Sequence, residues 1–273
     1  MIGGKEIVVV AAAIILTTVA IKASDSWFGN KSSGADKNGD GPCPIDMVYV
    51  NFPGGGFCID KYEASPADDC PYANPNSQRE TRLNLDYKDC QPVSAPGRIP
   101  WRFISQNQAA LACAKAGKRL PTNKEWLAAA LGTPDPVNNW TADDCQVDDN
   151  WNQQPGLTGS GANCISAAGA YDMVGNVWEW VEGTVAEGRF NNKSLPESGY
   201  ILGIDEDGLP SQTTMGTGDP NYYYDYFWLK ETEIRGLARG GYWHNGADAG
   251  QYALYAVAPP SFSGAGVGFR CVK

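Results

Sequence analysis

Imidazole groups and closely spaced thiols, which bind most transition metals in proteins, are nearly absent from this chain of 273 residues. It has one histidine, His244, and none of its eight cysteines forms a CxxC pair. A structural zinc site takes four such ligands, so the composition argues against zinc. Lysines and arginines number 21 against 31 aspartates and glutamates. With a net charge of −10 and no basic stripe, nucleic acid is not an expected partner.

Long apolar runs are also absent, except for one at residues 7–21, which Lys5 and Lys22 flank. A membrane-spanning helix needs about 20 apolar residues and tolerates about 17, so this run is short. We expect residues 1–23 to be an N-terminal membrane anchor or uncleaved signal segment, with a cleaved signal peptide as the alternative. Small polar residues predict a flexible linker at 24–44.

Export of the remaining chain agrees with the cysteine count. Eight is an even number, and the cysteines form no metal-binding cluster. We therefore expect four disulfides formed in an oxidising compartment. The predicted location is the cell surface, anchored by residues 7–21, or the extracellular medium.

The folded domain is expected at residues 45–273 as a mixture of strands and helices. The stretch 47–65 near its start predicts a strand, a glycine turn and a second strand. Residues 66–93 and 133–167 are polar and are expected to form loops. Residues 181–237 have long polar and aromatic stretches and are interpreted as an insertion on the domain's surface.

Two helices have clear start signals. Ser105–Gln108 and Thr122–Glu125 are capping boxes, in which the first and last side chains each bond to the other's backbone N–H. Each box opens an alanine-rich stretch. Gly117 and Gly132 are expected to end these helices, because glycine adopts the left-handed conformation found after a helix.

The C-terminal segment, 239–273, contains residues typical of turns and of a hydrophobic core, which we term the frame. Between them lie residues that share no chemical property, which we term the fillings. The frame includes Trp243, Leu254 and Phe269, which we expect to carry the core. Nine fillings follow neither a strand pattern nor a catalytic one: Tyr242, His244, Asp248, Tyr255, Val257, Ala258, Phe262, Gly264 and Gly266. All their residue types can be written as codons of the form NNC. Each is reached from the asparagine codon AAC by changing only its two adenines.

Four sequence blocks occur together in one order: MVYVNFPGGGFCIDKYEAS, AGKRLPTNKEW, YDMVGNVWEW, and RGG followed by W and GFR. The set resembles the formylglycine-generating-enzyme, or sulfatase-modifying-factor, family over residues 45–273, apart from the insertion. This resemblance implies an α+β fold of the C-type-lectin-like kind, loop-rich and stabilised by disulfides.

The C-terminal segment also resembles the variable region of proteins diversified by diversity-generating retroelements. In such proteins, error-prone reverse transcription alters the adenines of a template. They use this same fold and place their variable positions on its C-terminal ligand face. The resemblance implies a variable region at 239–271, with the nine fillings as its ligand-binding positions.

The family resemblance also implies an oxidase centre, but this chain lacks its ligands. The family's oxidase uses two cysteines shortly after the RGG block to bind copper. Asn245 and Gly250 stand at those positions, and neither an amide nor a hydrogen atom replaces a thiolate. We therefore expect no enzymatic activity.

Two structural features are implied by the same resemblance. The family binds Ca²⁺ with two side chains and two backbone carbonyls of the YDMVGNVWEW-like block. The matching positions are Asp172, Gly175, Val177 and Glu179, and we expect a structural calcium ion there. The family also links the cysteine before AGKRLPT to the one after GFR, here Cys113 and Cys271. Nearness in sequence then suggests the other pairs, namely Cys43–Cys58, Cys70–Cys90 and Cys145–Cys164.

The function that these features predict is non-catalytic ligand binding by a surface-displayed, diversified protein. Its expected ligands are proteins on other cells or viruses, with a glycan as another possibility. Two alternatives stay open. One is an altered oxidase of the family. The other is a structural, pilin-like surface subunit, in which Glu6 would be the fifth residue after cleavage behind Met1.

Overall fold

The computed structural model describes residues 42–273, which all fall within one compact unit. The anchor expected at 1–23 and most of the linker expected at 24–44 lie outside the described residues. Within the described part of the chain, no helix is both long enough and apolar enough to cross a bilayer.

Helix α3 (Gln106–Lys115) begins and ends where its signals predict. The Ser105 hydroxyl accepts a hydrogen bond from the Gln108 N–H at 3.3 Å, and the Gln108 side chain accepts one from the Ser105 N–H at 3.1 Å. Gly117 follows the helix with a φ of +67°. The second capping box opens α4 (Asn123–Ala130) in the same way. Both predicted helices are confirmed.

Helix α2 (Gln78–Asp86) was not expected, because residues 66–93 were assigned to a polar loop. Its N-cap is Ser77, whose hydroxyl accepts from the Glu80 N–H at 3.3 Å. The helix buries few side chains, among them Leu85. Its only apolar residues are Leu83 and Leu85, so the stretch is polar enough to resemble a loop, and the loop assignment is wrong here.

Two small sheets precede the main one. The predicted strand, turn and strand form an antiparallel pair, β1 (Met47–Val50) and β2 (Phe57–Asp60). A second antiparallel pair joins β3 (Ala64–Pro66) to β4 (Pro92–Ser94). Near the end of the chain, Val272 forms bridges to both Ile59 and Arg119, so the C-terminus ties β2 to the segment before α4.

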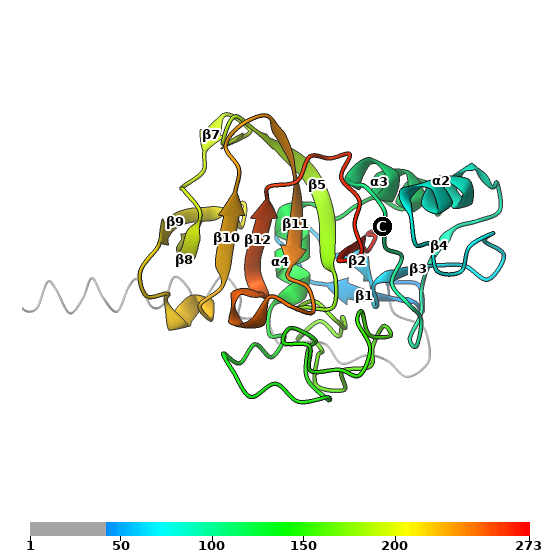
Figure 1. The fold of residues 1–273 in the computed structure, drawn as a ribbon, viewed down its shortest axis with the longest axis horizontal. Helices are drawn as coiled ribbons and strands as arrows, with labels where there is room; N and C mark the ends of the chain where they lie inside the picture. Colours follow the sequence, from blue (N-terminus) through cyan, green and yellow to red (C-terminus); the bar gives the residue numbers. More distant parts are fainter. Residues whose placement is uncertain (1–41) are drawn as a thin grey trace, which may run out of the picture. The chain divides into compact units, whose positions relative to one another are not determined.

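The main sheet has nine strands in the described residues, and Figure 1 shows them curling across the molecule beside the helices. Its path runs β7, β6, β5, β11, β12, β10, β8, β9, with β13 paired to β5. The strands are β5 (Trp178–Ala186), β6 (Arg189–Phe190), β7 (Lys193–Ser194), β8 (Gly199–Ile204), β9 (Pro210–Thr214), β10 (Tyr226–Leu229), β11 (Ile234–Gly240), β12 (Gly250–Ala256) and β13 (Val267–Phe269). Two short 3-10 helices, η1 (Pro220–Tyr222) and η2 (Gly246–Asp248), lie in its connections.

Pairing in this sheet mixes both directions. β13 runs parallel to β5, and β10 runs parallel to β12, whereas β11 is antiparallel to both β5 and β12. Parallel neighbours need long connections, so the last strands of the chain return to strands formed much earlier. The C-terminal segment is thereby held at the middle of the sheet.

The interpretation of residues 181–237 as a surface insertion is wrong. This segment supplies most of β5 and all of β8 and β10, which belong to the main sheet. Val181, Ile201 and Phe227 are fully buried in one hydrophobic cluster. The segment's polar and aromatic character reflects strands that are exposed on one face rather than a separate surface layer.

Two large hydrophobic clusters form the core. One gathers Trp101 and Cys113 of the α3 region with Trp180 and Phe269 of the sheet. The other contains Trp126 of α4 and the buried face of the central strands. All eight cysteines are paired, in the arrangement expected above: Cys43–Cys58, Cys70–Cys90, Cys113–Cys271 and Cys145–Cys164.

The four disulfides differ in the length of chain they close, which predicts a difference in stabilisation. Cys113–Cys271 spans 158 residues and Cys43–Cys58 spans 15. In the chain-entropy model these loops are worth about 5 and about 3 kcal/mol. Replacing both members of the long-range pair by alanine should therefore lower the free energy of unfolding, measured in urea, more than the same change at the short-range pair. An equal or smaller loss would contradict this ordering.

Candidate functional site

A cavity of about 390 Å³ lies where β5, β10, β11 and β12 meet the returning segment 262–267. Its lining is almost entirely aromatic or small, and no lining residue carries a charge: Trp178, Trp180, Trp228, Ala238, Tyr242, Asn245, Tyr255, Phe262, Gly264, Ala265, Gly266 and Val267. A wider depression of about 550 Å³ lies between α2 and the start of α3. None of the predicted site residues lines that second depression.

Three tryptophans, Trp178, Trp180 and Trp228, form what we term the floor of the cavity. Trp178 and Trp180 are two residues apart on β5, so their side chains share a face of the sheet. The rings of Trp178 and Trp228 meet edge to face, with centroids 5.4 Å apart and planes at 88°. The indole N–H of Trp180 donates to the Ile104 carbonyl at 2.9 Å. Backbone pairing and packing therefore fix the floor.

Five of the nine predicted ligand positions line the cavity, and we term them the rim: Tyr242, Tyr255, Phe262, Gly264 and Gly266. The Tyr255 ring packs against Trp178 with centroids 5.4 Å apart, and Phe262 is 45% exposed. A Cβ on Gly266 would lie 2.9 Å from the Tyr242 ring, and one on Gly264 would lie 3.0 Å from the Phe262 ring. Larger residues at these glycines would displace the neighbouring rings, so the rim positions are sterically coupled.

Two further predicted positions lie outside the cavity on polar surface. His244 is exposed, and its Nδ1 shares a hydrogen bond with the Asp149 carboxylate of the 133–167 loop. Asp248 is half-buried at the end of η2. Burial raises the pKa of the Asp248 carboxyl, and a hydrogen bond from the Tyr200 hydroxyl partly offsets that rise.

The last two predicted positions follow β12. Val257 is half-buried, and Ala258 is only 6% exposed within the hydrophobic cluster around Trp101. The Ala258 carbonyl accepts from the Gly236 N–H at 2.9 Å, which ties this point of the chain to β11. The prediction that Ala258 faces a ligand is therefore wrong.

Trp243 is also placed differently from the sequence expectation. Leu254 and Phe269 are fully buried, as expected of core residues, but Trp243 is only half-buried and stays outside the large core clusters. Its ring packs on Tyr242 with centroids 5.0 Å apart. Its backbone N–H donates to the Asn176 carbonyl at 3.2 Å. Trp243 thus supports the rim from outside rather than carrying the core.

Sequence reasoning missed the contribution of Trp228 to the floor. It lies on β10, inside the segment misinterpreted as an insertion. In the structure Tyr226 and Trp228 are half-exposed while Phe227 between them is fully buried, but all three are aromatic, so the sequence itself shows no apolar–polar alternation. The alternating burial is typical of a strand with one solvent-facing side.

Gly250 occupies a position with no room for a side chain. A Cβ there would lie 1.9 Å from Oδ1 of Asp225, whose carboxyl group is fully buried. Oδ2 of Asp225 accepts from the Tyr252 N–H at 2.7 Å, which anchors this carboxyl beneath β12. Burial and the neighbouring Asp135 raise the pKa of Asp225 well above its usual range. Asn245, in contrast, lines the cavity, and its Oδ1 accepts from the Tyr242 N–H at 2.9 Å.

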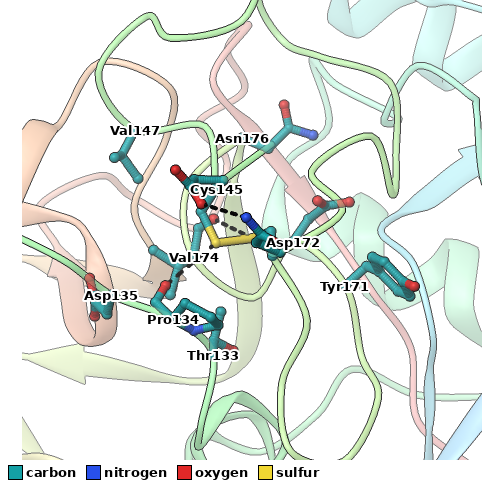
Figure 2. Close-up of a disulfide and its surroundings, with 12 residues drawn as sticks. Thr133, Pro134, Asp135, Cys145, Val147, Tyr171, Asp172, Val174 and Asn176 are labelled. Carbon is teal, nitrogen blue, oxygen red and sulfur yellow. Dashed lines mark hydrogen bonds between the residues drawn. A yellow bond between two sulfur atoms is a disulfide. The ribbon is translucent and has the colours of Figure 1, made fainter. Parts of the chain in front are cut away.

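The predicted calcium ligands are brought together by one tight segment before β5. The N–H of Asp172 donates to the Cys164 carbonyl at 3.1 Å, next to the Cys145–Cys164 disulfide (Figure 2). Gly175 has a φ of +76°, and a Cβ there would lie 2.0 Å from the Gln146 carbonyl oxygen. Only glycine fits this turn.

The side chains of this set have different surroundings. Oδ2 of Asp172 accepts from the Gly159 N–H at 2.6 Å, whereas its buried Oδ1 has no hydrogen-bond partner. Glu179 uses both oxygens on the Arg270 guanidinium, at 2.6 and 2.7 Å, and accepts from the Trp126 indole N–H at 2.6 Å. Asp172 thus has a buried oxygen without a partner, whereas both oxygens of Glu179 already accept hydrogen bonds from Arg270 or Trp126.

The same region contains a third buried carboxylate. Glu63 is fully buried and accepts from the Asn176 amide at 2.6 Å and from the Val177 N–H at 3.3 Å. Burial, together with the charges of Asp172 and Glu179, raises its pKa well above the usual range. Nowhere in residues 42–273 do three or more acidic, thiol or imidazole groups form a metal-binding cluster. Calcium binding at this segment stays a prediction.

The sequence of residues 29–273 matches the family described as the sulfatase-modifying factor enzyme 1-like domain. The chain belongs to this family. Its α+β architecture is accordingly the C-type-lectin-like fold of the formylglycine-generating-enzyme type, as the sequence predicted.

Two curated relatives are named inactive C-alpha-formylglycine-generating enzyme 2. The one from Bos taurus is 36% identical over 99 residues, covering 30% of this chain and 32% of the relative. The one from Mus musculus is 33% identical over 102 residues, covering 32% of each. The match thus spans about a third of the length of these relatives.

Several solved structures are similar at low sequence identity. The Major Tropism Determinant P3c variant has a TM-score of 0.44 at 20% identity, over 85% of this chain and 53% of that one. Treponema denticola variable protein 1 has a TM-score of 0.43 at 15% identity, over 84% and 99%. PvdO from Pseudomonas aeruginosa has a TM-score of 0.41 at 18% identity, over 89% of each chain.

The role of Glu179 can be tested by removing its charge without changing its size. Glu179→Gln should lower the free energy of unfolding by about 3–5 kcal/mol, because it leaves the buried Arg270 guanidinium unpaired. Glu182→Gln, at an exposed position of the same strand, is the control and should change it by about 0.5 kcal/mol or less. Denaturant unfolding with and without a calcium chelator measures both. A loss that chelation of the wild-type chain reproduces would instead assign Glu179 to calcium.

Proposed function

We propose that the domain is a non-catalytic ligand-binding protein of the sulfatase-modifying factor family, displayed outside the cell. In this proposal a retroelement diversifies its C-terminal segment, and the ligand enters the cavity between floor and rim. The ligands are proteins on other cells or on viruses. The segment at residues 7–21 would anchor the chain to a membrane.

One observation carries the proposal. Five positions singled out by the sequence pattern of the C-terminal segment and its resemblance to variable regions line a single cavity, although up to 24 residues separate them in sequence. Large, rigid rings such as Tyr242 and Phe262 suit a binding site, because they offer wide contact area and lose little conformational entropy. The tryptophans beneath them cannot be written as NNC codons. A fixed floor under a changeable rim supports recognition of varied targets.

The proposal that the domain is non-catalytic rests on the chemistry of Asn245 and Gly250. If the family's copper-binding cysteines align with these positions, the first presents an amide and the second presents no side chain. A thiol at Gly250 would also collide with the buried Asp225 carboxylate. The names of the two curated relatives, which describe inactive enzymes, agree with this proposal.

Display outside the cell is supported by the cysteines. Disulfides persist in oxidising compartments and are rare in reducing ones. This domain has four of them. A binding surface that faces foreign cells or viruses requires the same location.

The gene's codons test the diversification directly. Each of the nine positions from Tyr242 to Gly266 should be encoded by a codon ending in C, because mutation of AAC at its adenines never alters the third base. Sequencing should also find a reverse transcriptase nearby and a near-copy of the gene's 3′ end that differs at adenines. Tyrosine codons ending in T at Tyr242 and Tyr255 would refute diversification and leave an undiversified binding domain.

A further inference from the structure

We infer that the cavity is an aromatic box for an alkylammonium group, and that its natural occupant is a lysine side chain on a protein ligand. The inference rests on the proposed function and specifies the chemistry recognised by the floor. Since the floor tryptophans lie outside the diversified positions, their part in this preference would persist while the rim, which includes Tyr242 and Tyr255, changes.

The rings around the cavity are arranged as walls rather than as a stack. Trp178 and Trp228 stand at 88° to each other, which makes a right-angled corner. Tyr255 closes a third side, tilted by 38° to Trp178 and by 51° to Trp228, with centroids 5.4 and 6.5 Å away. Tyr242 stands at the rim. A compact cation inside would face several ring surfaces at once, which is the arrangement that favours cation–π attraction.

Charge complementarity favours a cation over a neutral or anionic group. No lining residue is charged, so no lysine or arginine of the lining already uses the ring faces. The charge of Arg235 acts on Tyr255, but this guanidinium is held by other groups, because its Nε donates to the Thr232 carbonyl at 2.8 Å and its terminal nitrogen pairs with Glu233. The chain's net charge of −10 further attracts cations.

The cavity also offers hydrogen-bond acceptors that a primary ammonium requires. Tyr242 and Tyr255, both half-buried in the lining, each carry a phenol hydroxyl. Burial raises the pKa of Tyr255, so this phenol stays neutral at physiological pH. Phenol oxygens accept as well as donate, and an ammonium has three hydrogens to give. A lysine side chain is long enough to reach the floor while its backbone stays at the rim.

Binding of small probes to the full chain tests this inference. Nα-acetyl-lysine methylamide should bind with ring-current shifts of its ε-methylene protons in an NMR titration. Its Nε-acetylated form has no charge and should bind about 3- to 30-fold more weakly, the range expected for a desolvated cation–π contact. Nα-acetyl-arginine methylamide is the third probe and should also bind more weakly, because a planar guanidinium matches parallel ring faces better than a corner.

Matched variants locate the binding. Trp228→Leu should reduce lysine-probe affinity by the same 3- to 30-fold, whereas Tyr87→Ala, at an exposed ring after α2, should leave it unchanged. Tyr255→Phe keeps the ring and removes the hydroxyl, so it should weaken binding less than Trp228→Leu. Near-ultraviolet circular dichroism of each variant verifies that it is folded.

Several outcomes would overturn the inference. Equal binding of the charged and acetylated probes would show an apolar pocket without cation preference. Tighter binding of the arginine probe would reject lysine as the occupant, and unchanged affinity in Trp228→Leu would place the probe elsewhere. If no probe binds while the codons fit diversification, this inference fails and the proposed function stands. If the codons do not end in C and the lysine probe binds, the diversification in the proposed function fails and this inference stands.

Discussion

Arg270 and Glu179 form an ion pair in which neither side chain reaches solvent, and the position of the C-terminal segment depends on it. Glu179 lies in β5, the strand that pairs with both β11 and β13. Arg270 follows β13 and also donates to the carbonyls of Asp60 and Tyr171, at 3.1 and 2.8 Å. One guanidinium thus holds three distant parts of the chain together: its own C-terminal segment, β2, and the stretch from Tyr171 to Glu179. Separating buried charges of this kind costs free energy, so the C-terminal segment is held at this one position beside β5.

Because the C-terminal segment always returns to the same place in the sheet, a variable surface is compatible with a fixed fold. The backbone of β12 and β13 is held by strand pairing, by the Cys113–Cys271 disulfide and by buried side chains such as Phe269. Between these anchors the rim residues project into a cavity whose floor belongs to β5 and β10. Exchange at Phe262, Gly264 and Gly266 therefore removes few core contacts, whereas Tyr242 and Tyr255 are half-buried and pack against the cluster around Trp101. Ala258 is an exception to this separation of variable positions from the core, because it is buried and accommodates little besides small residues.

The two capping-box helices can be predicted from local signals and the Cys113–Cys271 pair from the family resemblance, whereas the pairing of distant strands cannot be predicted from local patterns. The capping boxes at Ser105 and Thr122 predict helix starts because every interaction involved lies within four residues. The parallel pairing of β13 with β5 depends on contacts between distant residues, so no local pattern reveals it. The segment 181–237 was misjudged because its strands are exposed on one face and rich in tyrosine, and Trp228 was missed with it. Trp243 was misplaced because residue type does not tell on which side of a turn a large ring packs.

The central claim is that the rim can change while the fold stays. The most direct measurement compares a composite variant with a single core change in denaturant unfolding. The composite replaces Tyr242, His244, Asp248, Tyr255 and Phe262 by asparagine, the residue that AAC encodes. His244 and Phe262 are exposed and should each cost about 0.5 kcal/mol or less. Tyr242, Asp248 and Tyr255 are only half-buried, so the composite should lower the free energy of unfolding by less than the loss of one fully buried ring. The single change Phe269→Ala should cost about 3–5 kcal/mol. A composite that loses more stability than Phe269→Ala would show that the rim belongs to the core, and would contradict the account.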